Sequence, residues 1–150
     1  MDIRQSFNRN IFLVVLLSVS LFSFGGQTPD FRYRTLTIED GLRSNTVRNI
    51  VQDPRGFIWL GTDNGLCRYD GYNVAYYPIL QMGANQYIST IYSLSDGILV
   101  GTSQGAFYFD YRTEVFSRFI PQIKSEISSF SKDRDGNIWI ATMGQGGLLL

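Results

Sequence analysis

Apolar and polar positions alternate along most of the chain after residue 45, in short runs bounded by Gly, Asn, Asp or Pro. Such runs are typical of half-buried β-strands joined by tight turns. The first group of runs predicts four strands, at residues 46–52, 57–62, 66–69 and 74–77. The turns between them are Pro54-Arg55-Gly56, Asp63-Asn64-Gly65 and Asp70-Gly71, and Asn-Gly tolerates the positive φ of a hairpin. The pattern therefore predicts an antiparallel sheet of four strands within about 40 residues.

The same pattern recurs with a period of 40 residues. Gly61-Thr62, Gly101-Thr102 and Ala141-Thr142 occupy equivalent positions, each after an apolar run that contains Trp59, Leu99 or Trp139. Four short strands per repeat, with Trp and Gly at fixed places, are typical of the blades of a β-propeller. We expect Trp59, Trp139 and the smaller Leu99 to fill the space between neighbouring blades. The positions predicted to serve the fold of each repeat are Trp59, Gly61, Thr62, Gly65, Gly101, Thr102, Gly105, Trp139 and Thr142.

The predicted fold class is all-β, a partial β-propeller of about three four-stranded antiparallel blades, the last of them incomplete. The blades are expected at 42–82, 83–122 and 123–150, after a connecting segment at 26–41. Closed propellers typically have four to eight blades. We therefore expect the 150 residues to be a fragment of a larger propeller, whose remaining blades would be partners of this one.

The N-terminus predicts secretion. Arg4 and Arg9 precede an apolar run at 11–24, interrupted only by Ser. A helix of that length covers about 21 Å, short of a hydrocarbon core of about 30 Å. The run is typical of a signal peptide at 1–25, cleaved after Gly25, and the alternative is an uncleaved anchor. Either way the remaining chain lies outside the cytoplasm and contacts a membrane only through this segment.

Composition narrows the function classes. The chain has 13 Lys+Arg, 13 Asp+Glu and no His, and its basic residues form no cluster. No nucleic acid is therefore expected as a partner. The absence of His removes the commonest general base and the usual imidazole metal ligand. Cys67 is the one thiol, so an intramolecular disulfide is excluded and a small buried side chain is expected.

Two groups of acidic residues could either bind a metal or catalyse a reaction, or only form turns. The segment 133–137 resembles a calcium loop, but its Gly comes too early and no Glu closes it, so a hairpin turn is favoured. Asp53, Asp63 and Asp70 could be an acid/base pair for glycoside hydrolysis, which needs two carboxyl groups facing one bond. Asp53 and Asp70 recur in the repeat turns, which favours turn capping. We expect no catalytic residue, cofactor or metal in this segment.

The stretch 39–77, EDGLRSNTVRNIVQDPRGFIWLGTDNGLCRYDGYNVAYY, resembles the first repeat of the two-component-regulator propeller family. These are periplasmic sensor propellers at the N-terminus of hybrid two-component histidine kinases of Bacteroidetes. The resemblance runs from Phe31 onward, strongest in the first and third copies. It implies a periplasmic sensor of carbohydrate breakdown products, with no catalysis in this segment and a hybrid histidine kinase as the full-length parent. Homodimerisation of that parent is left open.

Two other hypotheses remain. The chain could belong to a secreted propeller enzyme or lectin that acts on polysaccharide, with its functional residues beyond Leu150. It could also be a truncated product that does not fold stably. The sequence that follows Leu150 would separate the first from the sensor.

The strand order predicts where a ligand could touch. If 46–52 is the innermost strand, the segment 43–45 and the turn 63–65 lie on one face, here called the upper face. Amides, charges and one aromatic ring suited to sugar hydroxyls gather there. The candidate ligand-binding residues, of which the resemblance fixes none, are Arg43, Asn45, Asp63, Asn64, Gln86, Tyr87, Gln104 and Gln145. Turn chemistry alone could explain Asn64 and Gln104, each of which precedes a Gly.

An aromatic cluster offers a second surface. Tyr72, Tyr76 and Tyr77 could stack against sugar rings. An outer strand covered by its neighbours is the favoured interpretation, because the three residues form the aromatic tail of the first repeat.

Overall fold

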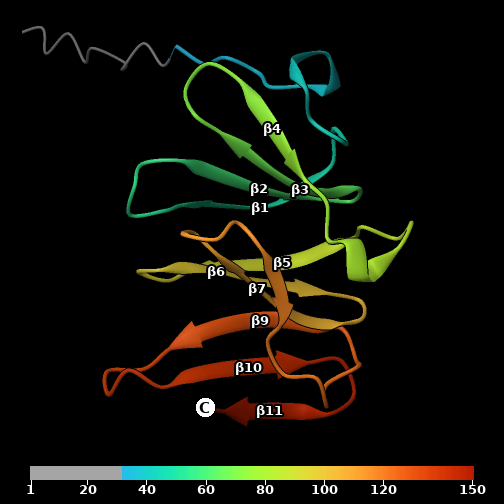
Figure 1. Ribbon diagram of the computed structural model, residues 1–150, viewed down its shortest axis with the longest axis vertical. Coiled ribbons are helices and arrows are strands. Elements are labelled where there is room, and N and C mark those ends of the chain that lie inside the picture. The colour runs from blue at the N-terminus through green and yellow to red at the C-terminus, as the bar shows by residue number, and fades with distance from the viewer. Residues whose placement is uncertain (1–31) are drawn as a thin grey trace, which may run out of the picture. The chain divides into compact units, whose positions relative to one another are not determined.

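The computed structural model describes residues 32–150 (Figure 1). The predicted signal peptide at 1–25 and residues 26–31 of the segment at 26–41 lie outside the described residues. The chain divides into two units, Met1–Arg34 and Thr35–Leu150, and the strands found in residues 32–150 belong to the second. Within the described residues no helix is both long and apolar enough to cross a membrane.

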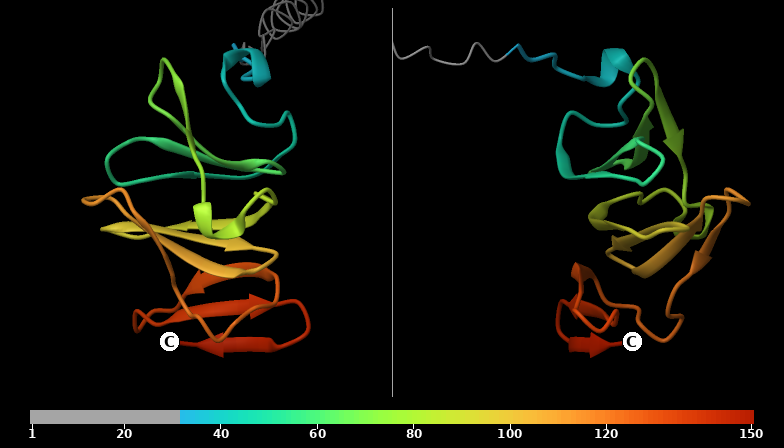
Figure 2. Two further views of the ribbon diagram at one scale, coloured as in Figure 1. Left: turned by 45° about the vertical axis from the view of Figure 1, so that its right-hand side comes forward. Right: turned by 90° about the vertical axis from the view of Figure 1, so that its left-hand side faces the viewer.

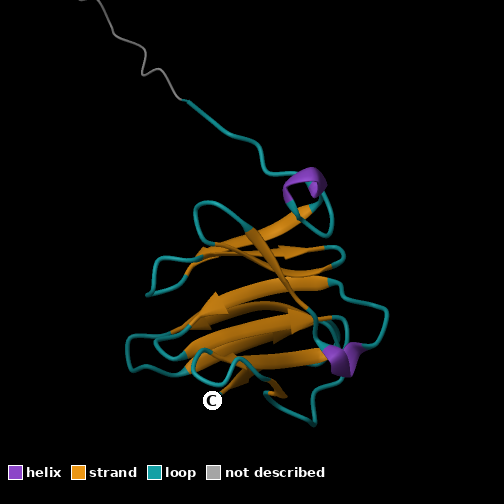
Figure 3. Cartoon of the chain, turned by 45° about the horizontal axis from the view of Figure 1, so that its top comes forward, coloured by secondary structure: helices purple, strands orange, loops and turns teal. Residues whose placement is uncertain are grey.

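The described residues are almost entirely strands and the turns between them, with two short 3-10 helices (Figure 3). The elements are η1 (Ile38–Asp40), β1 (Val47–Gln52), β2 (Ile58–Thr62), β3 (Gly65–Tyr69), β4 (Val74–Tyr77), η2 (Leu80–Met82), β5 (Ile88–Ser93), β6 (Gly97–Thr102), β7 (Gly105–Asp110), β8 (Phe116–Arg118), β9 (Ile127–Lys132), β10 (Ile138–Thr142) and β11 (Gly146–Leu149). The four strands predicted in the first repeat match β1 to β4 within one residue at each end.

The strands form three antiparallel sheets, ordered β1-β2-β3-β4, β5-β6-β7-β8 and β9-β10-β11. The sheets lie one upon another, with β1 against β5 and β5 against β9, as Figures 1 and 2 show. This is the arrangement of successive propeller blades, with β1, β5 and β9 innermost. The structure confirms the all-β, partial-propeller fold, and the third blade has three strands where the others have four.

The core lies between the sheets. Trp59 is fully buried between the first two, with its ring 5.0 Å from Tyr77, 5.3 Å from Phe109 and 6.4 Å from Tyr111, centroid to centroid. Aromatic pairs at these distances stabilise a core beyond the area that they bury. Leu99 occupies the same place between the second and third sheets and is also fully buried. Both side chains thus fill the space between blades, as predicted.

Trp139 departs from that prediction. It is 46% exposed, because it points to the opposite side of β10 from the buried Ile140, which packs against the second sheet. No described sheet covers that side. The repeat position is the same as that of Trp59, but the neighbour that buries Trp59 has no counterpart here among the described residues.

The repeated Thr-Gly pairs build the turn between the second and third strands of each blade. The hydroxyl of Thr62 donates to the Gly65 carbonyl at 2.8 Å and accepts from the Asn64 N–H at 3.1 Å. Thr102 and Thr142 make the same two bonds in their blades. The closing glycines Gly65, Gly105 and Gly146 have φ of 125°, 109° and 74°, a region that favours Gly. These repeat positions are therefore structural.

The outer side of the first sheet is closed by the chain that leads into it. Leu42, Leu60 and Cys67 form a buried cluster on this side, with Leu36 packed against it. The side chains of Thr37 and Asp40 cap η1, and the Asn45 side chain accepts the Ile38 N–H at 2.9 Å. Cys67 is buried as expected, and burial raises the pKa of its thiol.

Candidate functional site

The lower face, defined by the turns at 53–57, 94–97 and 133–137, is organised by carboxylates. Asp53 is buried, and its Oδ1 accepts the N–H groups of Arg55 and Phe57 at 2.9 and 3.0 Å. Its Oδ2 accepts the indole N–H of Trp59 at 3.0 Å and the Arg55 guanidinium at 2.9 Å. Asp53 thus caps the turn and satisfies the polar atom of the buried Trp59.

The third repeat contains the same device. Asp133 accepts the N–H groups of Asp135 and Asn137 at 3.0 and 2.9 Å, and the indole N–H of Trp139 at 3.1 Å. The segment 133–137 is therefore the hairpin turn that the sequence favoured, between β9 and β10. In the second repeat Leu94 takes the place of the Asp and Leu99 that of the Trp, so the two partners are absent together.

Asp70 and Asp110 do comparable work at the ends of β3 and β7. The Asp70 carboxylate accepts the N–H groups of Tyr72 and Asn73 at 2.8 and 2.7 Å, and Asp110 repeats this with Arg112 and Thr113. Turn capping is thus confirmed for Asp53 and Asp70, because each carboxylate accepts N–H groups of its own turn.

These turns predict acid sensitivity. Burial by itself raises the pKa of Asp53, but its hydrogen bonds from Trp59 and Arg55 outweigh burial and hold that pKa below its ordinary value. Hydrogen bonds from Asn137 and Trp139 lower the pKa of Asp133, and backbone N–H groups lower the pKa values of Asp70 and Asp110.

A carboxylate with a depressed folded pKa stabilises the fold above its unfolded pKa, about 3.9 for Asp, and loses this stabilisation as pH falls through the folded pKa. With no His in the chain, we expect a constant urea midpoint from pH 5 to 8 and a fall below about pH 4. A midpoint that declines between pH 7 and 5 would contradict this.

The upper face is shaped by a β-bulge at the same place in each blade. The strand pairing skips Arg48, Ser89 and Ser128, the second residues of β1, β5 and β9. Bulges bend a strand and redirect side chains. Next to the bulges, Asn49 donates its amide to the Ser89 carbonyl at 2.7 Å, and the Ser89 hydroxyl donates to the Ile127 carbonyl at 2.5 Å. Side chain to backbone bonds thus join the three innermost strands.

A row of polar side chains crosses the three blades above these bulges. Arg48 Nε donates to Asp63 Oδ1, and the guanidinium carbon lies 4.9 Å from the centre of the Tyr87 ring. The Tyr87 hydroxyl lies 3.5 Å from Glu126 Oε1, at the limit of a hydrogen bond. The hydrogen bond that Arg48 donates to Asp63 raises the pKa of Arg48, so the guanidinium stays charged. We call Asp63, Arg48, Tyr87 and Glu126 the upper-face row.

Some of the predicted ligand residues lie in or next to the upper-face row. Others form side-chain hydrogen bonds to the backbone. Asp63 and Tyr87 are members, and the Gln145 amide oxygen accepts from Ser125, which directly precedes Glu126. Arg43 lies over the Tyr76 ring at 4.6 Å, and the Asn64 amide donates to the Arg43 carbonyl at 3.4 Å.

The remaining candidates are used within the fold. Gln86 is buried, accepts the Ile79 N–H at 3.0 Å and donates to the carbonyls of Ile79 and Gly83. The Asn45 side chain holds η1, and the Gln104 amide reaches the Met82 carbonyl at 3.4 Å. These three side chains therefore have less hydrogen-bonding capacity left for a ligand than the members of the upper-face row have.

Arg48 was missed because it was assigned to a strand rather than to a loop. A polar residue in the alternating pattern of 46–52 indicates an exposed side chain, but the bulge beside it is not evident from the sequence. Glu126 lies in the segment that leads into β9, at the end of the strand where the upper face was expected.

The tyrosines of the first repeat are distributed differently. Tyr77 packs against Trp59 and Phe109, and Tyr76 lies beneath Arg43, as expected for a covered outer strand. Tyr72 is 85% exposed, in the turn before β4, and contributes no packed surface.

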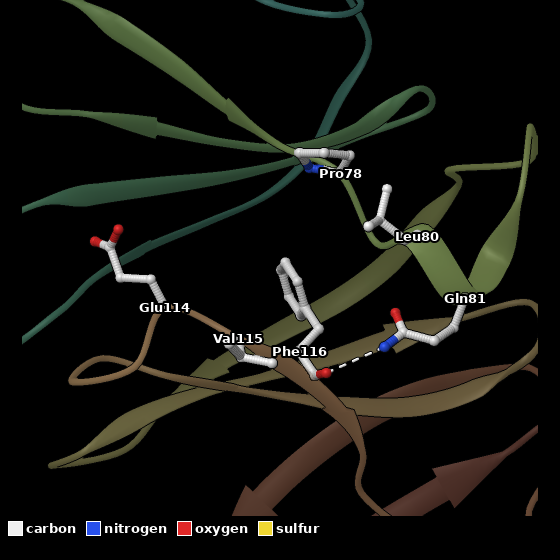
Figure 4. A pocket seen from close by; sticks show the side chains of 6 residues that line it. All are labelled: Pro78, Leu80, Gln81, Glu114, Val115 and Phe116. Carbon is white, nitrogen blue, oxygen red and sulfur yellow. Dashed lines mark hydrogen bonds between the residues drawn. The ribbon is translucent and has the colours of Figure 1, made fainter.

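Two hollows lie away from the upper-face row. One of about 200 Å³ is lined by Pro78, Leu80, Gln81, Glu114, Val115 and Phe116 (Figure 4). The Gln81 amide in it donates to the Phe116 carbonyl of edge strand β8 at 3.1 Å. This covers part of an exposed strand edge. The lining is mainly apolar and has few convergent polar groups, unlike a site for a hydroxylated ligand.

The other hollow, of about 440 Å³, is lined by Leu94, Asp96, Tyr108, Ser117, Arg118 and Phe119. Tyr108 occupies in the second sheet the position of Arg68 in the first, opposite Leu99 as Arg68 is opposite Trp59. At the first junction Glu114 of the second blade pairs with Arg68 at 3.5 Å.

Comparison with known proteins distinguishes the first and third repeats from the second, as the Asp residues of their turns also do. The sequence profile described as "Two component regulator propeller" matches residues 41–64 and 122–144. These are the repeats that contain the Asp and Trp pair, Asp53 with Trp59 and Asp133 with Trp139. The chain contains two-component-regulator propeller repeats.

Two relatives extend the comparison. Histidine kinase P4 of Formosa agariphila is 36% identical over 70 residues, 47% of this chain and 5% of that protein. The extracellular domain of a hybrid two-component system of B. thetaiotaomicron superposes with a TM-score of 0.69 at 24% identity, over 78% of this chain and 18% of that one. This likeness supports the propeller fold of the two-component-regulator repeats. The chain spans less than a fifth of either relative.

Proposed function

We propose that this chain is part of a ligand-sensing β-propeller of a two-component signalling protein. In this proposal it lies outside the cytoplasm, binds carbohydrate breakdown products through its upper face, and performs no catalysis itself. The repeats shared with two-component regulators and the 36% identity to a histidine kinase support the signalling context. The similar solved structure is described as an extracellular domain, which supports the location.

The observation on which the binding role depends is the upper-face row. Asp63 and Arg48 come from the first blade, Tyr87 from the segment before β5, and Glu126 from the segment before β9. All four are at least partly exposed. Charged groups and a phenolic hydroxyl converging from separate elements are suited to sugar hydroxyls. A site assembled from three blades would also respond to changes in how the blades pack.

Absence of catalysis is inferred from how the carboxylates are used. Asp53, Asp70, Asp110 and Asp133 are each held by two or more N–H groups of their own turn. Such bonds keep a carboxyl group ionised and fixed, which does not suit a general acid. Asp63 is occupied by Arg48.

Binding can be tested on the purified chain. Isothermal titration calorimetry with a panel of defined oligosaccharides of two to six sugars should give saturable binding for at least one of them. Arg48→Gln should weaken that binding, whereas Arg112→Gln, which removes the same charge from a lower-face turn, should leave it unchanged. Release of reducing ends from any panel member would overturn the non-catalytic role, and no binding across the panel would overturn the sugar-binding role.

The signalling role needs a test in cells. With Arg48→Gln introduced into the full-length protein, growth on the bound oligosaccharide should no longer induce the genes for its use. Transcript levels equal to those of the wild type in that strain would mean that the upper face takes no part in signalling.

A further inference from the structure

The guanidinium of Arg48 is held in one orientation with part of its binding capacity unused. Asp63 accepts from Nε, on one side of the guanidinium, and the guanidinium carbon lies over the Tyr87 ring, 4.9 Å from its centre. Among the described residues the two terminal nitrogens of Arg48 have no acceptor. The side chain is partly exposed, so these nitrogens face solvent.

An arginine fixed in this way suits one class of ligand group. The two terminal nitrogens of a guanidinium present parallel N–H groups that match two oxygens of a carboxylate or a sulfate. Fixing the side chain beforehand reduces the entropy lost on binding. A neutral hydroxyl can accept only one of these N–H bonds and carries no charge.

We propose that the ligand of the upper face carries an anionic group, the carboxylate of a uronic acid or the sulfate of a sulfated sugar, and that Arg48 binds it through both terminal nitrogens. Asp63 and Tyr87 act as positioning residues. This inference rests on the proposed function and names the chemical class of its ligand.

The distribution of charge between the two faces favours the same class. Near the upper face, Arg43, Arg48, Arg118 and Lys124 outnumber the acidic Asp63 and Glu126. In the turns at the opposite ends of the strands, acidic residues outnumber the basic Arg55, Arg112 and Arg134. The acidic ones are Asp53, Asp70, Asp96, Asp110, Glu114, Asp133 and Asp135. The chain has no net charge, yet the two faces differ in sign. Such a field steers anions toward the upper face.

The test compares acidic and neutral trisaccharides of the same backbone, with uronic-acid and sulfated forms as separate arms. Calorimetry on the full chain should show binding of at least one acidic form about tenfold or more tighter than its neutral counterpart, as expected for a charge-assisted bidentate pair. Raising NaCl from 50 to 500 mM should weaken that binding.

Variants distinguish a specific role of Arg48 from a general effect of the protein's charge. Arg48→Gln should remove the preference for the acidic form, and Arg48→Lys should retain only part of it, because Lys lacks the planar pair of donors. Asp63→Asn keeps an acceptor for Nε and removes an opposing charge, so it should bind the acidic form more tightly, and a purely structural Asp63 would give weaker binding. Arg112→Gln is the control for equal loss of charge.

The outcomes distinguish this inference from the proposed function. Binding of neutral trisaccharides with no acidic preference would leave the sensor proposal standing and overturn the anionic ligand. Acidic preference that survives Arg48→Gln would overturn the assignment to Arg48. Failure of both panels to bind would count against the proposed function itself.

Discussion

Replacing Asp53 with alanine is expected to destabilise the chain by about 2 to 4 kcal/mol, the range for leaving several buried donors without partners. The substitution removes the acceptor of the Trp59 indole N–H and of two backbone N–H groups in the turn. Trp59 is fully buried, so water cannot replace the lost acceptor. Urea unfolding of the full chain, followed by tryptophan fluorescence, measures the change. A midpoint equal to that of the wild type would contradict the role assigned to Asp53.

The third repeat supplies the matched control. Asp133→Ala removes the same kind of bonds, but Trp139 is half exposed, so water can satisfy its indole N–H. We expect a loss of about 1 kcal/mol or less. Trp59→Phe removes the indole N–H while keeping an aromatic ring, so Asp53→Ala and Trp59→Phe should be less than additive when combined. Equal effects of Asp53→Ala and Asp133→Ala would mean that the turn, rather than the buried indole, determines the stability.

Much of the fold was predictable because it depends on local residues repeated at a fixed spacing. The Thr-Gly turns and the Asp-containing turns each satisfy their own backbone groups, so their residues identify them wherever they recur. The weaker resemblance of the second repeat also has a physical explanation. Leu94 and Leu99 replace a hydrogen-bonded pair by two apolar side chains, so the repeat keeps its shape and loses its most distinctive residues.

The candidate site was only partly predictable, because its members meet through tertiary contacts. The upper face was expected from strand order; Asp63 and Tyr87 lie beside Arg48 there, and their part in ligand binding stays a prediction. The position of Arg48 depends on the bulge in β1, and no residue of that strand predicts a bulge. The commitment of Gln86 to the Ile79 backbone depends on how the connection between β4 and β5 folds back.

Gly101→Ala is the second substitution for which a large effect is expected. A Cβ at Gly101 would lie 2.5 Å from Thr90 Cγ2 and 2.9 Å from Ile127 Cβ, which belongs to the innermost strand of the next blade. Ile127 Cβ is bonded to the backbone and cannot withdraw without moving its strand, whereas Thr90 Cγ2 can withdraw only by a change of the χ1 rotamer. Overpacking of this kind costs about 1 to 3 kcal/mol. We expect Gly101→Ala to lower the urea midpoint of the full chain accordingly, and an unchanged midpoint would show that the second and third blades are less tightly joined than these contacts indicate.

The repeat offers two comparisons that isolate packing from backbone effects. Ala141 occupies the position of Gly101 in the third blade, so alanine is compatible with the strand where no described sheet lies against it. Gly147→Ala introduces the same methyl group at a strand position whose nearest neighbour, the Ile140 carbonyl, would be 3.9 Å away. We expect this variant to stay within about 0.5 kcal/mol of the wild type. Thr90→Ser removes the Cγ2 atom that would clash, so combined with Gly101→Ala it should restore part of the loss. Failure of Thr90→Ser to restore any stability would place the strain at Ile127, and thus at the contact between blades.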